Sequence, residues 1–179
     1  MTRRRALLGL GVVALLALAG PLLSPYPLTL VTQALVVAIL AMSLDVLLGY
    51  TGLPSLGHAA YWGVGAYAVA LLATDHGVGL AGCAAVGVLL AAATAAVFGL
   101  VAIRAAGTYF LMITLALGMV VWGLAFRWVS LTKGDNGVSG VPRPELLASP
   151  LPFYYFALAA AALVWIALGL LVASPFGLT

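Results

Sequence analysis

Long apolar stretches alternate with short polar breaks along this chain. The apolar stretches cover approximately residues 6–23, 28–50, 56–73, 78–103, 108–131 and 151–173. Each is about 18 to 26 residues long, and about 20 helical residues are enough to cross the hydrocarbon core of a bilayer. The pattern therefore predicts an all-α chain, a polytopic bundle of about six transmembrane helices that forms one domain over residues 1–179.

The composition places the chain in a lipid bilayer. Hydrophobic residues make up 65% of the sequence and charged residues only 6%, and the mean hydropathy is +1.25. A chain of this size with so few charges lacks the polar surface that a soluble domain exposes to water. The net charge of +3 is too small and too local to predict nucleic-acid binding. The bilayer is the predicted environment.

The positive charges predict an orientation. Arg3, Arg4 and Arg5 precede the first span, and Arg104 lies in a short loop without a neighbouring acid. Lys and Arg favour the cytoplasmic side of a membrane protein. Threading the chain from a cytoplasmic N-terminus puts Arg104 inside and the loop 132–150 outside. An alternative interpretation of the first stretch is a secretory signal with a small-residue cleavage site at 17–19.

Several kinds of chemistry have no support in the residue spacing. His58, Asp75, His76 and Cys83 do not follow the spacing of a zinc site, so no metal or cofactor is expected on this chain. No G-x-x-x-x-G-K-[ST] motif occurs, so ATP binding by a P-loop is not predicted. Ser55 lacks the G-x-S-x-G context of a nucleophilic serine. These observations argue against an enzyme.

Glycine and proline interrupt the apolar pattern between the second and third stretches. The residues are Gly49, Gly52, Pro54 and Gly57, enough to end a helix. One interpretation is a tight turn at the inner face. The other is a discontinuous helix in which Ser55 is the N-cap and free N–H groups form a positive end that holds a carboxylate. The residues alone leave both open.

Polar side chains gather around this break. The candidates for a substrate path are Asp45, Tyr50, Thr51, Ser55 and His58. A carboxylate buried within a span is costly, so it tends to line a cavity or an interface. Asp45 is therefore the most informative of the five, although bonds to nearby backbone or to Tyr50 would make it structural. A lone histidine such as His58 is more often a packing residue than a ligand.

Small residues recur every fourth position on two predicted spans. In the third stretch the stripe consists of Ser55, Ala59 and Gly63. In the fourth stretch it consists of Gly79, Cys83, Gly87, Ala91, Ala95 and Gly99. Such stripes let neighbouring helices approach closely in a membrane. The G-x-G-x-x-A pattern at 63–68 follows no strand, so a dinucleotide site is not predicted.

Two long segments resemble a known family. The run LDVLLGYTGLPSLGHAAYWGVGAYAVALL at 44–72 and the segment 104–142 resemble the membrane permease subunit of branched-chain amino acid ABC importers. The second segment carries Arg104, Gly107, Tyr109 and Phe110 and an outer-loop motif of Gly134, Asp135, Asn136 and Gly137. The chain departs from the family at position 45, where Asn is common and Asp45 stands here, which makes this position pH-sensitive.

The resemblance implies a transport component of the bacterial inner membrane and not an enzyme. Its implied partners are a second permease subunit, two cytoplasmic ATPase subunits and a periplasmic solute-binding protein. Permeases of this kind also carry urea, amides or simple sugars, and a packing or assembly protein without a transport path is the alternative from another class. The family chain continues past 174–177 into a basic cytoplasmic coupling loop, which we expect these 179 residues to lack.

Overall fold

The described chain is helical throughout, without a strand. The structure is a computed structural model that describes the backbone of residues 3–174 and the side chains of residues 8–174. Its helices are α1 (Arg3–Ala19), α2 (Pro25–Gly49), α3 (His58–Asp75), α4 (Leu80–Ala102), α5 (Thr108–Arg127), α6 (Val129–Thr132) and α7 (Pro150–Ala173). Short 3-10 turns are η1 (Gly20–Leu22), η2 (Gly134–Asn136) and η3 (Glu145–Leu147). The side chains of Arg3, Arg4 and Arg5 and the predicted chain end at 175–177 lie outside the described residues.

The prediction of an all-α membrane protein is confirmed. Among the described residues α2, α4, α5 and α7 are long and apolar enough to cross a bilayer. The apolar part of the first helix, Leu8–Leu22, is shorter than these four, and α3 carries His58 and Asp75 at its two ends. The count of six spans stays a prediction.

Two boundaries differ from the sequence prediction for local reasons. Helix α2 begins at Pro25 and not at 28, because extended Ser24 (φ −67°, ψ 161°) precedes a proline that suits the first helical turn. The predicted span 108–131 is wrong at its end. The backbone leaves the helix at Trp128 (φ −84°, ψ 61°), and the short α6 follows.

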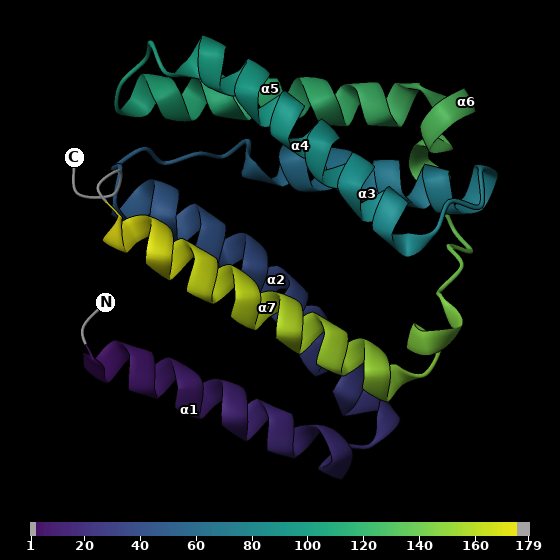
Figure 1. The fold of residues 1–179 in the computed structure, drawn as a ribbon. Helices are drawn as coiled ribbons and strands as arrows, with labels where there is room; N and C mark the ends of the chain where they lie inside the picture. Colours follow the sequence, from purple (N-terminus) through teal and green to yellow (C-terminus); the bar gives the residue numbers. More distant parts are fainter. Residues whose placement is uncertain (1–2, 175–179) are drawn as a thin grey trace. The chain divides into compact units, whose positions relative to one another are not determined.

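The described chain consists of two compact units, and each is described by itself. The first comprises Met1–Thr51 and Glu145–Thr179, and the second comprises Gly52–Pro144. The first therefore holds α1, α2 and α7, and the second holds α3 to α6 (Figure 1). The single domain over residues 1–179 stays a prediction.

In the first unit α7 contacts both α1 and α2. Helices α2 and α7 run parallel, since Leu28 and Tyr154 near their starts belong to one core and Asp45 and Val172 near their ends line one pocket (Figure 1). Helix α1 runs antiparallel to α7. The fully buried Tyr154 donates its hydroxyl to the carbonyl oxygen of Leu16 at 2.6 Å. The core consists of Leu28, Leu35, Tyr154, Ala157, Leu158 and Ala161.

In the second unit α3 and α4 are an antiparallel pair. The ring of Tyr61 meets that of Phe98 edge to face at a centroid distance of 5.2 Å. Nearer the connection between the helices, Gly65 lies against the backbone of Gly87. Only 11 to 17% of the residues in the four candidate spans are buried inside the chain. Most of their surface is therefore free to contact lipid or other chains.

Candidate functional site

The Gly/Pro segment separates α2 from α3 with irregular backbone. Helix α2 ends at Gly49, and Gly52 adopts a positive φ of 68°, which favours glycine. Helix α3 begins at His58 with Gly57 as its N-cap residue (φ −87°, ψ 3°), and no side chain bonds to this cap. The interpretation in which Ser55 caps α3 is therefore wrong, because Ser55 lies two residues before the N-cap position, in the irregular segment that also contains Pro54.

The end of this segment packs against the middle of α5. The N–H of Leu56 donates to the hydroxyl oxygen of Thr114 at 3.2 Å. A Cβ atom on Gly57 would overlap the carbonyl oxygen of Thr114, and one on Gly118 would lie 3.3 Å from the Cα atom of Gly57. Thr114 and Gly118 stand near the centre of Thr108–Arg127, a candidate span.

This contact bears on the two interpretations of the break. Irregular backbone at the depth of the hydrocarbon is tolerated where it is buried in protein or lines a cavity. Ser55 and Gly57 are both buried, and the Ser55 hydroxyl has no hydrogen-bond partner among the described residues. His58 is half-buried and its ring lies 5.5 Å from that of Tyr61. The contact of Gly57 with the middle of α5 agrees with the discontinuous helix, whereas the contact of Tyr61 with Phe98 near the end of α4 agrees with a turn near the membrane face. Both interpretations therefore stay predictions.

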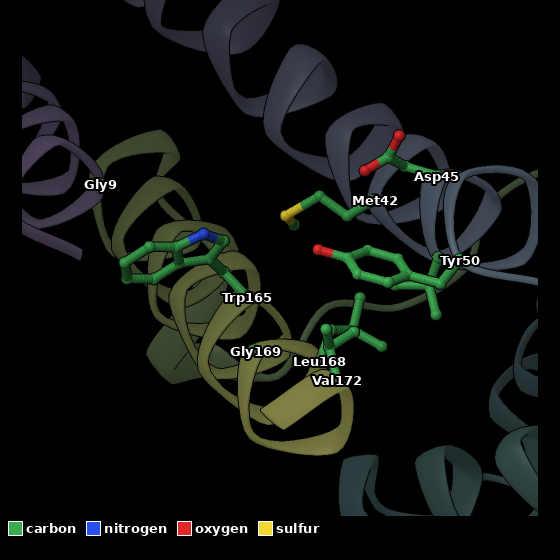
Figure 2. Close-up of a pocket in the computed structure, with 9 residues that line it drawn as sticks. Gly9, Met42, Asp45, Tyr50, Trp165, Leu168, Gly169 and Val172 are labelled. Atoms are coloured by element: carbon green, nitrogen blue, oxygen red, sulfur yellow. The ribbon is translucent and has the colours of Figure 1, made fainter. Parts of the chain in front are cut away.

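Asp45 and Tyr50 line a pocket inside the first unit. The α2–α7 pocket has a volume of about 230 Å³ and is lined by Gly9, Met42, Asp45, Val46, Tyr50, Trp165, Leu168, Gly169 and Val172. Figure 2 shows Met42, Asp45 and Tyr50 on α2 and its C-terminal end, with Trp165 opposite on α7. Asp45 is exposed in this pocket and not buried as the sequence suggested.

The structure divides the predicted substrate-path residues between the two units. Asp45, Tyr50 and Thr51 belong to the first unit, whereas Ser55 and His58 belong to the second. Thr51 is exposed, and its hydroxyl donates to the carbonyl oxygen of Leu47 at 2.5 Å, so it closes the last turn of α2.

The sequence interpretation missed Met42 and Trp165. Helical spacing could have found Met42, since it precedes Asp45 and Val46 by three and four residues and so shares their face. Trp165 stands likewise before Leu168, Gly169 and Val172 on α7. Only the pairing of α2 with α7 reveals that these two faces meet, because about 120 residues separate Asp45 from Trp165 in the sequence.

Only some residues of the two small-residue stripes contact another helix of this chain. A Cβ atom on Gly65 would lie 3.4 Å from the carbonyl oxygen of Gly87 and 3.6 Å from the Cβ atom of Ala91. Ala95 is half-buried. Cβ atoms on Gly63 and Gly99 would meet nothing within 4 Å. The close approach on α3 therefore belongs to Gly65 and not to Gly63.

The outer-loop motif forms a tight turn at the end of α6. Gly134, Asp135 and Asn136 make up η2, and Gly134 and Gly137 both have positive φ. The buried hydroxyl of Thr132 lies 2.5 Å from the carbonyl oxygen of Ala125 and accepts the N–H of Gly134 at 3.4 Å. Asp135 and Asn136 remain exposed. The motif thus fixes the backbone while leaving two polar side chains accessible. Among the described residues, no group of three or more His, Cys, Asp or Glu could hold a metal ion.

Apolar helices with a buried, irregular segment between them are features of polytopic membrane proteins that move solutes. Residues 26–179 match the family described as the permease component of branched-chain amino acid transport systems. The chain therefore belongs to this permease family, and the resemblance found in the sequence is confirmed.

Two curated relatives have the same name, high-affinity branched-chain amino acid transport system permease protein LivM. The protein of Escherichia coli K12 is 34% identical over 132 residues, which cover 73% of this chain and 31% of the relative. That of Salmonella typhimurium LT2 is 34% identical over 115 residues, which cover 64% of this chain and 27% of the relative. The matched residues thus span between a quarter and a third of the length of these relatives. No solved structure matches the chain significantly.

Proposed function

We propose that this chain is the membrane-spanning permease subunit of an ATP-driven importer and forms part of the path for branched-chain amino acids. The family match over residues 26–179 carries this proposal. The buried irregular segment against the middle of α5 supports it, because a plain packing protein has no need for a break at that depth. ATP hydrolysis then belongs to separate subunits.

The proposed assembly contains the partners that the resemblance implies. They are a second permease subunit, two cytoplasmic ATPase subunits and a periplasmic solute-binding protein that delivers the amino acid. The location is the bacterial inner membrane with a cytoplasmic N-terminus, since the positive charges of Arg3–Arg5 and Arg104 favour that side.

The direction of α2 and α7 supports six crossings. These two helices run parallel within the first unit, so an odd number of crossings must connect them. Helices α4 and α5 are both candidate spans and supply two. The segment that contains α3 supplies the third. Because α1 lies antiparallel along α7, it completes a set of six.

Uptake by the reconstituted assembly tests the proposal. The chain is combined with its second permease, ATPase and binding-protein partners in proteoliposomes, and labelled leucine, isoleucine and valine are supplied with ATP. We expect accumulation that requires both ATP and this chain. Uptake of urea, an amide or a simple sugar in place of these amino acids would contradict the substrate. Full uptake without this chain would favour a packing or assembly role.

A further inference from the structure

The α2–α7 pocket combines one anionic group with two aromatic side chains that also donate hydrogen bonds. The anion is the carboxylate of Asp45, and the donors are the Tyr50 hydroxyl and the Trp165 indole N–H. Figure 2 shows Tyr50 directed into the space between the two helices, whereas the ring of Trp165 extends from α7 towards Gly9 of α1. The remaining lining residues are apolar side chains or glycines.

The carboxylate of Asp45 is available to a positively charged ligand. No hydrogen bond or ion pair to Asp45 is present within residues 8–174, and none of the nine lining residues is a Lys, Arg or His. A carboxylate on a membrane helix is stabilised by a cation or by water in a cavity. The faces of Tyr and Trp rings attract an ammonium group as well.

The walls of the pocket suit a small apolar chain. Met42, Val46, Leu168 and Val172 line it from both helices. Its volume of about 230 Å³ lies below the roughly 300 to 1,000 Å³ of sites for drug-sized ligands. Gly9 holds the wall on the α1 side, because a Cβ atom there would overlap the ring of Trp165.

We infer that this pocket binds an α-amino acid with a branched aliphatic side chain. Asp45 accepts hydrogen bonds from the ammonium group, Tyr50 and Trp165 donate to the carboxylate, and the apolar walls enclose the side chain. This inference rests on the proposed function and adds a site to it. The pocket lies towards the C-terminal ends of α2 and α7, which the predicted orientation puts on the cytoplasmic side. The site would thus hold the amino acid before its release into the cell.

A second source of the same chemistry is the bilayer itself. Phosphatidylethanolamine also presents a primary ammonium group close to apolar chains, so its headgroup could occupy the acidic end of the pocket. The shared feature is a primary ammonium group, and the lipid composition of the experiment separates the two sources.

Ligand binding to the purified 179-residue chain in nanodiscs tests the inference. The reporter is a chain in which Trp62, Trp122 and Trp128 are replaced by Phe, so that fluorescence comes from Trp165 alone. The probes are leucine, 4-methylpentanoate, which lacks the ammonium group, and 3-methylbutylamine, which lacks the carboxylate. We expect leucine to bind at least about tenfold more tightly than either analogue, since each lacks a charge-assisted hydrogen bond. Equal binding of leucine and 4-methylpentanoate would overturn the role of Asp45.

Variants in the pocket and matched controls outside it locate the binding. Asp45→Asn should weaken leucine binding about tenfold, whereas Asp75→Asn, the same change at an exposed acid in the other unit, should not. Tyr50→Phe is compared with Tyr26→Phe at the start of α2. Gly169→Leu fills the pocket without removing a polar group and should abolish binding. Unchanged binding in Asp45→Asn and Gly169→Leu would overturn the assignment even if Tyr50→Phe fails to fold.

The lipid and the transport function are tested separately. Leucine should bind equally in nanodiscs of phosphatidylcholine and in nanodiscs that also contain phosphatidylethanolamine. Binding that disappears in the second kind would assign the pocket to the lipid headgroup and overturn the amino-acid ligand. ATP-dependent uptake that is normal in Gly169→Leu would reject this site and leave the proposed importer function standing. Leucine binding without ATP-dependent uptake would support this site and contradict the proposed importer function.

Discussion

Gly57 shows how the absence of a methyl group positions the irregular segment before α3. Its Cα atom lies against Gly118, and its missing side chain leaves room for the carbonyl oxygen of Thr114. The adjacent Leu56 N–H uses the Thr114 hydroxyl in place of a helical partner. A buried backbone N–H without a partner is costly, so this bond stabilises the end of the irregular segment, where Ser55 and Gly57 are buried.

Replacing Gly57 by Ala should disturb this contact. The new Cβ atom would meet backbone, which cannot rotate away as a side chain can, so we expect the free energy of unfolding to fall by about 1 to 3 kcal/mol. Leucine uptake should fall while membrane insertion is unchanged, because insertion depends on summed apolarity. Gly63→Ala is the matched control, since its Cβ atom meets nothing within 4 Å. Equal uptake in the two variants would contradict a functional role for the break.

The neighbouring residues Tyr154 and Tyr155 give a second matched pair. Both hydroxyls donate to carbonyl oxygens near the end of α1, Tyr154 to Leu16 at 2.6 Å and Tyr155 to Ala17 at 3.0 Å. Tyr154 is fully buried, whereas Tyr155 is 38% exposed. We expect Tyr154→Phe to lower the free energy of unfolding in detergent by about 1 to 2 kcal/mol and Tyr155→Phe by about 0.5 kcal/mol. A larger loss for Tyr155→Phe would show that burial does not set the cost.

The pairing of α3 with α4 depends on a close approach between the backbones of the two helices. Helices α3 and α4 meet where Gly65 faces Gly87, and Val69 covers the same glycine. Lipid is as apolar as a leucine side chain, so close packing, rather than escape from water, drives the association of membrane helices. Farther along α4 the buried residues Phe98 and Ala102 continue the face of Gly87, since 11 residues make about three helical turns. A stripe of every fourth residue drifts off this face, which leaves Gly99 exposed.

The α3–α4 contact predicts different tolerance at two glycines of one helix. In Gly87→Val the first added atom would lie 2.8 Å from a methyl group of Val69 and 3.2 Å from the carbonyl oxygen of Gly65. In Gly99→Val it would meet open space. The intrinsic cost of Val in a helix is the same at both positions. We therefore expect Gly87→Val to be less stable than Gly99→Val by about 1 to 3 kcal/mol in unfolding experiments in detergent. Equal stability would place the helix contact elsewhere.

The proposed topology of these 179 residues rests on parity as well as on charge. Parallel α2 and α7 need three crossings between them if α4 and α5 both span the membrane. The third crossing then includes α3 and the irregular segment before it. This conclusion agrees with the cytoplasmic N-terminus predicted from Arg3–Arg5 and Arg104.

Cysteine labelling tests this topology in intact cells and in inverted vesicles. The natural Cys83 is buried and is replaced by Ala, and single cysteines are placed at the exposed positions Ala106 and Ser139. Ser139 is chosen because it lies in the same loop as Thr132 but is exposed, whereas the hydroxyl of Thr132 is buried and holds the turn before Gly134. An impermeant thiol reagent should reach Ser139→Cys from outside and Ala106→Cys from inside. The opposite pattern would invert the orientation, and labelling of both from one side would contradict three crossings.

The sequence was sufficient for the class of fold, for the approximate positions of the long helices and for the family. Apolar length fixes which segments are compatible with a bilayer, and local signals such as Ser24 followed by Pro25 fix where a helix begins. The same local information identified Asp45 and the Gly/Pro break as unusual for a membrane helix, because an ionisable side chain and irregular backbone are both costly there. These properties depend on residues close together in the chain.

The residues that those side chains contact depend on packing between helices that are far apart in the sequence. Periodicity on α3 pointed to Gly63, and only the position of α4 shows that Gly65 makes the close contact. Ser55 is a good N-cap residue by type, yet the contact of Gly57 with Thr114 and Gly118 shifts the start of α3 to His58. Asp45 meets Trp165 in one pocket because α7 returns parallel to α2. A side chain's chemistry is local, but the groups that face it come from helices whose pairing depends on the summed fit of many small contacts.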